Sequence, residues 1–185
     1  MIDEALAAGN TVIYNHPEWS GTPARDIEKL TGFSLMEIWN SNNVIRMGLD
    51  AHAAYWDELL WNGRKIFGVA GDDAHQPQHI AHGYVMVRAE KSLDSILSAL
   101  QKGAFYASCG PEIHDFYVED GVATVLCSPA CKVRFRNFHF PYEGVTGEGL
   151  TAASVGIIPG TKYIRAEVED EKGHVAWTNP IFFEE

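Results

Sequence analysis

The sequence lacks the features that mark membrane proteins and nucleic-acid-binding proteins. No apolar run approaches the roughly 18 residues that a membrane-spanning helix needs. The 14 Lys and Arg residues are outnumbered by 25 Asp and Glu residues, which gives a formal net charge of −11. Affinity for nucleic acid comes largely from basic side chains that contact phosphates, so we expect no nucleic-acid partner, and no membrane partner either.

Cysteine is scarce as well. The sequence has 3 cysteines, at Cys109, Cys127 and Cys131. Because their number is odd and none are spaced as Cys-x-x-Cys, they favour free thiols and small core residues over a metal site. The N-terminal residues are too polar and too few for a signal peptide. The location in the cell stays open, with the cytoplasm favoured, because the natural N-terminus need not be Met1.

Up to about residue 110, short apolar runs alternate with helical patterns. Hydrophobic residues make up 46% of the 185 residues, which is enough for a core. One helix is expected to begin with Thr22 as its N-cap and Pro23 at its first position. The alternation predicts a parallel sheet with right-handed crossovers in residues 1–110. The expected strands cover residues 10–17, 33–40, 65–71 and 82–90, and the expected helices residues 2–9, 22–32, 53–63 and 92–103.

The pattern changes to all-β in residues 111–185. Apolar and polar residues alternate there, and turn sequences such as Asp120-Gly121 and Lys172-Gly173 separate the runs. This indicates a small antiparallel, sandwich-like sheet. The sequence therefore predicts an α/β unit followed by a β-rich extension.

Three of the expected parallel strands carry polar residues at or just beyond their ends. These residues are Asn15 and His16, Glu37 to Asn40, and the Asp72–His75 segment. The carboxyl ends of parallel strands are where ligands bind, and neighbouring ends meet at one edge. Imidazoles together with carboxylates suit Zn, Mn or Fe better than Ca or Mg. The alternative is that these residues cap the helices that follow, and the pattern alone leaves both open.

The remaining histidines and basic residues carry weaker signals. His79 and His82 are most simply exposed loop residues, with substrate contact as the second interpretation, and His52 is expected to cap a helix or lie on the surface. Arg64 and Lys65 precede a strand, so they belong to the end of the sheet opposite the predicted site. We assign no chemistry to His114, His139 and His174. Neither a glycine-rich phosphate loop nor a Ser-His-Asp arrangement is present.

Several segments together resemble the PHP (polymerase and histidinol phosphatase) family, in particular its metal-dependent phosphoesterases with a C-terminal β-extension. The segments are YNHP, MEIWN, WDELLWNGRKIFGVAGDDAH, SALQKGAFYASCGPEI and AWTNPI. The resemblance implies a distorted seven-stranded β/α barrel with divalent metals at its C-terminal rim. It also implies hydrolysis of phosphoesters by a metal-activated water.

The resemblance assigns roles to particular residues. It makes His16, Asp73 and His75 ligands of divalent metal ions such as Zn, Mn or Fe. The number of ions stays open. Residues expected to support the rim or to act as further ligands are Asn15, Glu37, Asn40 and Asp72, and those expected to contact the substrate are His79 and His82.

The sequence departs from the family at its start. Family members begin with a strand that ends in His-x-His, whereas only 15 residues precede His16 and they contain no histidine. Residues 1–110 therefore resemble the C-terminal half of the barrel, and residues 111–185 its extension. We expect this chain to pair with a second copy or with a missing N-terminal half. The alternative is a non-catalytic remnant that serves as an interaction or assembly module, and neither the substrate nor the metal is identifiable.

Overall fold

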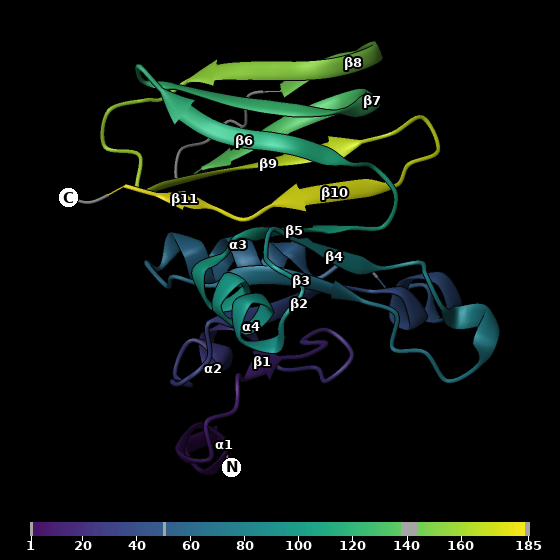
Figure 1. The fold of residues 1–185 in the computed structure, drawn as a ribbon, viewed down its shortest axis with the longest axis vertical. Coiled ribbons are helices and arrows are strands. Elements are labelled where there is room, and N and C mark those ends of the chain that lie inside the picture. The colour runs from purple at the N-terminus through teal and green to yellow at the C-terminus, as the bar shows by residue number, and fades with distance from the viewer. Residues whose placement is uncertain (1, 50, 138–143, 184–185) are drawn as a thin grey trace. The chain divides into compact units, whose positions relative to one another are not determined.

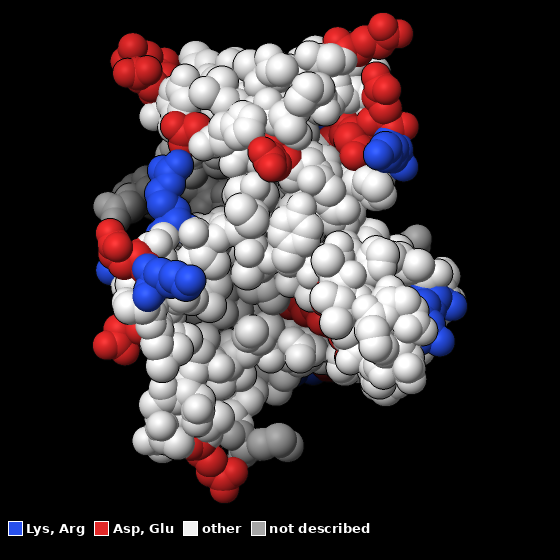
Figure 2. All heavy atoms as spheres, turned by 45° about the vertical axis from the view of Figure 1, so that its right-hand side comes forward, with Lys and Arg blue, Asp and Glu red and all other residues white. Residues whose placement is uncertain are grey.

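The structure is a computed structural model that describes residues 2–49, 51–137 and 144–183. It divides into two compact units, Met1–Ala107 and Ser108–Glu185, and each is described by itself (Figure 1). The first unit is mixed α/β, and the second is an antiparallel β-sheet. Asp and Glu side chains are scattered over the face drawn in Figure 2, as the net charge of −11 leads one to expect.

The first unit contains a small parallel sheet. Its strands are β1 (Ile13–Tyr14), β2 (Leu35–Asn40) and β3 (Phe67–Gly71), in the order β1-β2-β3. β1 pairs with β2, and β2 with β3, both in parallel. All six residues of β2 are buried or half-buried, as expected for a central parallel strand. The predicted parallel sheet is confirmed for three of its four expected strands, whereas the strand expected over residues 82–90 lies next to β5 (Phe105–Ser108) in another sheet.

Helices and two further strands complete the first unit, and Figure 1 shows α3 and α4 beside the small sheet. β4 and β5 are neighbours in the strand order. The helices are α1 (Ile2–Ala7), α2 (Ala24–Ile27), the π-helix η1 (Asn42–Arg46), α3 (Ala53–Trp61), the 3₁₀-helix η2 (Pro77–His79) and α4 (Leu93–Lys102), and the strands are β4 (Tyr84–Val87) and β5 (Phe105–Ser108).

The ends of α4 follow from its sequence. Ser92 is the N-cap, and its Oγ accepts a hydrogen bond from the Ser95 N–H over 3.3 Å. Gly103 ends the helix with φ 73°, the left-handed conformation that glycine adopts without strain. Leu100 packs against the cluster of Leu35, Val69 and Phe105, so this helix covers the core of the first unit.

The prediction for α2 is wrong in its length and its cap. The helix has 4 residues and begins at Ala24, with Pro23 rather than Thr22 at the N-cap position. Pro23 is extended, with φ −61° and ψ 144°, and has no side-chain acceptor for the helix N–H groups. Beyond the helix, the N–H of Leu30 bonds to the carbonyl of Ile27, which tightens the chain into a turn. Burial of Ile27, at 0% exposure, holds this short helix in place.

Gly68 lies where β3 packs most closely against its neighbours. A Cβ atom at this buried position would lie 2.7 Å from Ile38 Cδ1 and 3.0 Å from Trp56 Cη2. We expect Gly68→Ala to lower the free energy of unfolding by about 1–3 kcal/mol, because overpacking forces these side chains off their rotamers. Gly71→Ala is the matched control, since its nearest neighbour would be Glu37 Oε1 at 3.9 Å. Equal urea midpoints for the two variants would contradict the expectation.

The second unit is a curled antiparallel sheet in the form of a half-barrel (Figure 1). Within it the strand order is β10-β9-β7-β6, with β11 beside β9 and β8 beside β7. Its strands are β6 (Ile113–Glu119), β7 (Val122–Asn137), β8 (Gly144–Gly156), β9 (Tyr163–Glu169), β10 (Val175–Thr178) and β11 (Ile181–Phe182). The 16 residues of β7 pair with β6, β8 and β9. This continuity makes one curled sheet instead of the predicted sandwich-like arrangement.

Two local predictions for the second unit are confirmed. Asp120 and Gly121, with φ 48° and 75°, form the turn between β6 and β7, because both central residues of such a turn need positive φ. The three cysteines are free thiols. His139 lies outside the described residues.

Candidate functional site

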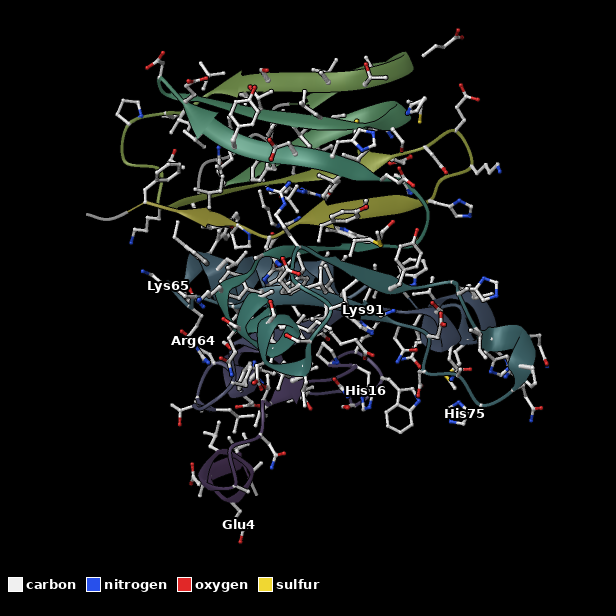
Figure 3. All side chains as sticks on the ribbon, in the orientation of Figure 1. Glu4, His16, Arg64, Lys65, His75 and Lys91 are labelled. Carbon is white, nitrogen blue, oxygen red and sulfur yellow. The ribbon has the colours of Figure 1, made fainter. Side chains whose placement is uncertain are left out.

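Most of the predicted site residues lie at the carboxyl ends of β1, β2 and β3. His16 follows β1, Glu37 lies within β2, and Asp73 and His75 follow β3. Figure 3 shows the side chains of His16 and His75 on the same side of the first unit, whereas Arg64 and Lys65 lie at the other end. The Arg64 guanidinium donates to the Glu28 carbonyl over 2.7 Å, away from the strand ends.

His16 is held by its backbone and by one ring nitrogen. Its N–H donates to Glu37 Oε2 over 2.7 Å, and its Nδ1 lies 2.9 Å from Ser20 Oγ. The Trp19 ring meets the imidazole edge-on, with centroids 5.0 Å apart. The φ of His16 is 36°, an uncommon conformation for a residue other than glycine that is concentrated at functional sites. Because Nδ1 faces Ser20, Nε2 is the nitrogen left to contact a ligand.

Glu37 and Asn40 form a buried support beneath His16. Besides the His16 N–H, Glu37 accepts a hydrogen bond at Oε1 from Asn40 Nδ2 over 3.2 Å. Asn40 Oδ1 accepts in turn from the Asn43 N–H over 3.0 Å. Burial raises the pKa of Glu37, and the hydrogen bonds from Asn40 and His16 oppose this rise. Both oxygens of Glu37 are therefore engaged in positioning the chain at the ends of β1 and β2.

Asp72 fixes the loop that follows β3. Its carboxylate accepts hydrogen bonds from the N–H groups of Ala81, His82 and Gly83 over 2.6, 2.8 and 2.7 Å. Burial raises the pKa of Asp72, but these three bonds outweigh it, and the net pKa is lowered. A Cβ atom at Gly83 would lie 2.6 Å from Trp39 Cδ1, so this close approach requires glycine. We call the contact of Asp72 with residues 81–83 the Asp72 clamp.

Asp73 and His75 are exposed and interact with each other through the backbone. His75 Nδ1 donates to the Asp73 carbonyl over 2.7 Å, which leaves the lone pair on Nε2. Asp73 has φ 50°, and its Oδ2 accepts from Asn42 Nδ2 over 3.4 Å. Asn15, the remaining predicted site residue before β2, is exposed.

The strand ends bring some of these residues together but not all. The His16 N–H donates to Glu37, and the charge of Asp73 raises the pKa of Glu37, so His16 and Asp73 both lie near this carboxylate. Within the part of the chain that the structure describes, no group of three or more His, Cys, Asp or Glu side chains is arranged to hold a metal ion. The nitrogen and oxygen donors of His16, Asp73 and His75 therefore fit a divalent metal in kind, but these residues do not enclose one.

His52 was expected to cap a helix or to lie on the surface, but it is buried near His16. It occupies the N-cap position of α3 but makes no capping hydrogen bond with its side chain, and it is 0% exposed. Neither ring nitrogen has a hydrogen-bond partner among the described residues, and Glu18 Oε2 lies 3.6 Å from Nδ1. Burial, together with the charge of His16, lowers the pKa of His52 to about 4. No sequence signal distinguishes this histidine from an exposed cap.

The two loop histidines differ in exposure. His82 is exposed as expected, but His79 is only 7% exposed, so the expectation of an exposed loop residue is wrong for His79. Its ring meets the backbone of His75, four residues earlier, and the guanidinium of Arg46, which lies 33 residues earlier and is not predictable from the local sequence.

Comparison with protein families gives one match. Residues 62–105 match the family model described as PHP-associated. No curated protein matches the chain. No solved structure matches it either. The matched segment contains β3, Asp73 and His75.

Among the described residues, no helix has the length and apolar character that crossing a bilayer requires.

Proposed function

We propose that this chain carries part of a metal-dependent phosphoesterase site of the PHP type. The observation that carries the proposal is the position of the PHP-associated segment, because residues 62–105 include the strand end with Asp73 and His75. The parallel sheet is then part of the family's distorted β/α barrel, and the second unit is its β-rich extension. The reaction is hydrolysis of a phosphate ester.

His16, Asp73 and His75 are the proposed metal ligands. In both histidines Nδ1 faces an oxygen and Nε2 remains for a ligand, an arrangement typical of metal-binding histidines. A divalent ion such as Zn²⁺, Mn²⁺ or Fe²⁺ would supply an activated water and neutralise phosphoryl charge. Glu37 holds the His16 backbone, and Asn42 holds the Asp73 carboxylate.

We further propose that residues from outside this chain complete the site. β1 is an edge strand of the sheet, and Ile13 within it is 42% exposed. Edge strands readily pair with another chain. A second copy, or a polypeptide with a His-x-His strand, would cover this edge and add ligands beside His16.

Metal retention tests the proposal directly. After dialysis against Mn²⁺ or Zn²⁺, we expect His16→Ala and Asp73→Asn to bind the ion at least about tenfold more weakly than the wild type, because each loses a ligand. His114→Ala, which alters an exposed histidine of the second unit, is the control. Adding a polypeptide with the His-x-His strand should then give metal-dependent hydrolysis of p-nitrophenyl phosphate.

Two outcomes would count against it. Unchanged metal affinity in both ligand variants would reject His16 and Asp73 as ligands. If the chain associates with itself or with the added polypeptide and no hydrolysis follows, the assembly-module alternative replaces the enzyme.

A further inference from the structure

A small pocket opens beside the strand ends. It lies between η1, which follows β2, and the loop that contains η2, which follows β3. Asn42 lines the pocket and donates to Asp73 Oδ2, so the pocket adjoins the proposed metal ligands. Its lining residues are Ser41, Asn42, Ile45, Arg46, Gln78, His79 and His82.

The lining is basic and polar in a strongly acidic chain. Among the described residues, no Asp or Glu belongs to it, although the formal net charge is −11. Figure 2 shows Lys or Arg at the edge of the part formed by η1 and the 76–83 loop, whose outward surface in this view is otherwise white. Such a lining attracts an anion and repels a cation.

More N–H groups face the His79 ring than the ring can accept hydrogen bonds from. The His75 N–H donates to Nδ1 over 3.1 Å, which places the ring proton on Nε2. That proton then faces Arg46 Nη1 over 2.6 Å, and a guanidinium only donates. In the other tautomer Arg46 donates to Nε2, and the proton on Nδ1 faces the His75 N–H instead.

Neither tautomer satisfies all of these donors, because a neutral imidazole has a single lone pair. Protonating the ring would only add a further donor. An anionic oxygen between Arg46 and His79 Nε2 would accept from both groups. The arrangement therefore needs an acceptor that the described residues do not supply.

The surrounding backbone holds these donors in position. Arg46 ends a π-helix, an irregular element that is frequent at functional sites. The Asp72 clamp fixes residues 81–83 just beyond His79, and His82 Nε2 lies 3.1 Å from the Gln78 carbonyl. Both sides of the pocket are thus formed before a ligand arrives.

We propose that this pocket binds the phosphoryl group of a phosphomonoester, with Arg46 and His79 Nε2 donating to its non-bridging oxygens. The inference rests on the proposed function and deepens it by naming the substrate class. A dianionic phosphoryl group offers several charged acceptors and pairs well with a guanidinium. Ile45, which is 58% exposed, supplies an apolar wall for the organic part of the substrate.

Titration of inorganic phosphate into the metal-free chain in EDTA tests the pocket apart from catalysis. Isothermal titration calorimetry at pH 7.5 and low salt is expected to show binding that weakens at least tenfold in Arg46→Gln. Arg25→Gln removes the same charge from an exposed position in α2 and should change the affinity less than twofold. Acetate, a carboxylate monoanion, should bind at least tenfold more weakly than phosphate.

The results separate this inference from the proposed function. Phosphate binding that Arg46→Gln leaves unchanged, no phosphate binding by the wild type, or equal binding of acetate would overturn the pocket. Phosphate binding that depends on Arg46, in a chain that never hydrolyses aryl phosphate with Mn²⁺ or Zn²⁺ and the added polypeptide, would uphold the pocket and reject the enzyme. Hydrolysis that is equally fast in the wild type and in Arg46→Gln would uphold the enzyme and reject the pocket.

Discussion

Replacing Glu167 with alanine is expected to lower the free energy of unfolding of the second unit by about 3–5 kcal/mol. Glu167 is 3% exposed and contacts three guanidinium groups. Its oxygens lie 3.0 Å from Arg165 Nη1, 3.0 Å from Arg134 Nε and 3.2 Å from Arg136 Nε. Without the carboxylate these cations repel one another in a buried site, and Arg165 is 0% exposed. Urea unfolding followed by circular dichroism measures the change.

Glu169→Ala is the matched control on the same strand. Glu169 also contacts Arg134 and Lys132, but its side chain is 22% exposed, so solvent screens its loss and we expect about 1 kcal/mol or less. Burial raises the pKa of Glu167, but Arg165 and Arg136 outweigh it and lower the pKa to about 2. The contribution of Glu167 is therefore complete above about pH 4.5 and is lost as the pH falls toward 2. Similar urea midpoints for the two variants would contradict the assignment.

The stability of the first unit is expected to fall by about 3 kcal/mol between pH 7.5 and pH 4 because of His52. The unfolded chain protonates this imidazole near pH 6.5, whereas in the folded protein its pKa is lowered to about 4. Between these values the unfolded state binds one more proton, so acid favours unfolding. The contribution is fully present above about pH 6.5 and is lost as the pH decreases.

His52→Leu isolates this effect, because the variant keeps an apolar side chain in the buried position and has no proton to bind. The difference in unfolding free energy between wild type and variant should change by about 1.4 kcal/mol per pH unit between pH 6 and pH 4.5. His114→Leu, at an exposed position, should keep the wild-type slope. Parallel pH profiles for the wild type and His52→Leu would show that His52 titrates normally.

Features with local causes were predictable from the sequence. Ser92 and Gly103 mark both ends of α4, and Asp120-Gly121 marks the turn after β6, because capping and positive φ depend on the residue itself. The parallel pairing of β1, β2 and β3 followed from the alternation of apolar runs with helices.

Features that depend on distant contacts were not predictable. Nothing in the residues around His52 or His79 indicates their burial, which comes from elements far along the chain. The polar residues at the strand ends were identifiable, since parallel strands finish at one edge. Their grouping was not, because the positive φ of His16 and of Asp73 turns each side chain in a direction that no periodicity encodes.

The Asp72 clamp has a consequence for the thermodynamics of binding at the pocket. Ordering a flexible loop costs about 1–2 kcal/mol of backbone entropy per residue, and a ligand that orders its own loop loses that much affinity. Here three hydrogen bonds to Asp72 order residues 81–83 when the protein folds. A small anion in the pocket therefore keeps the binding energy that a mobile loop would consume. A group with few atoms can then bind measurably without help from the rest of a substrate.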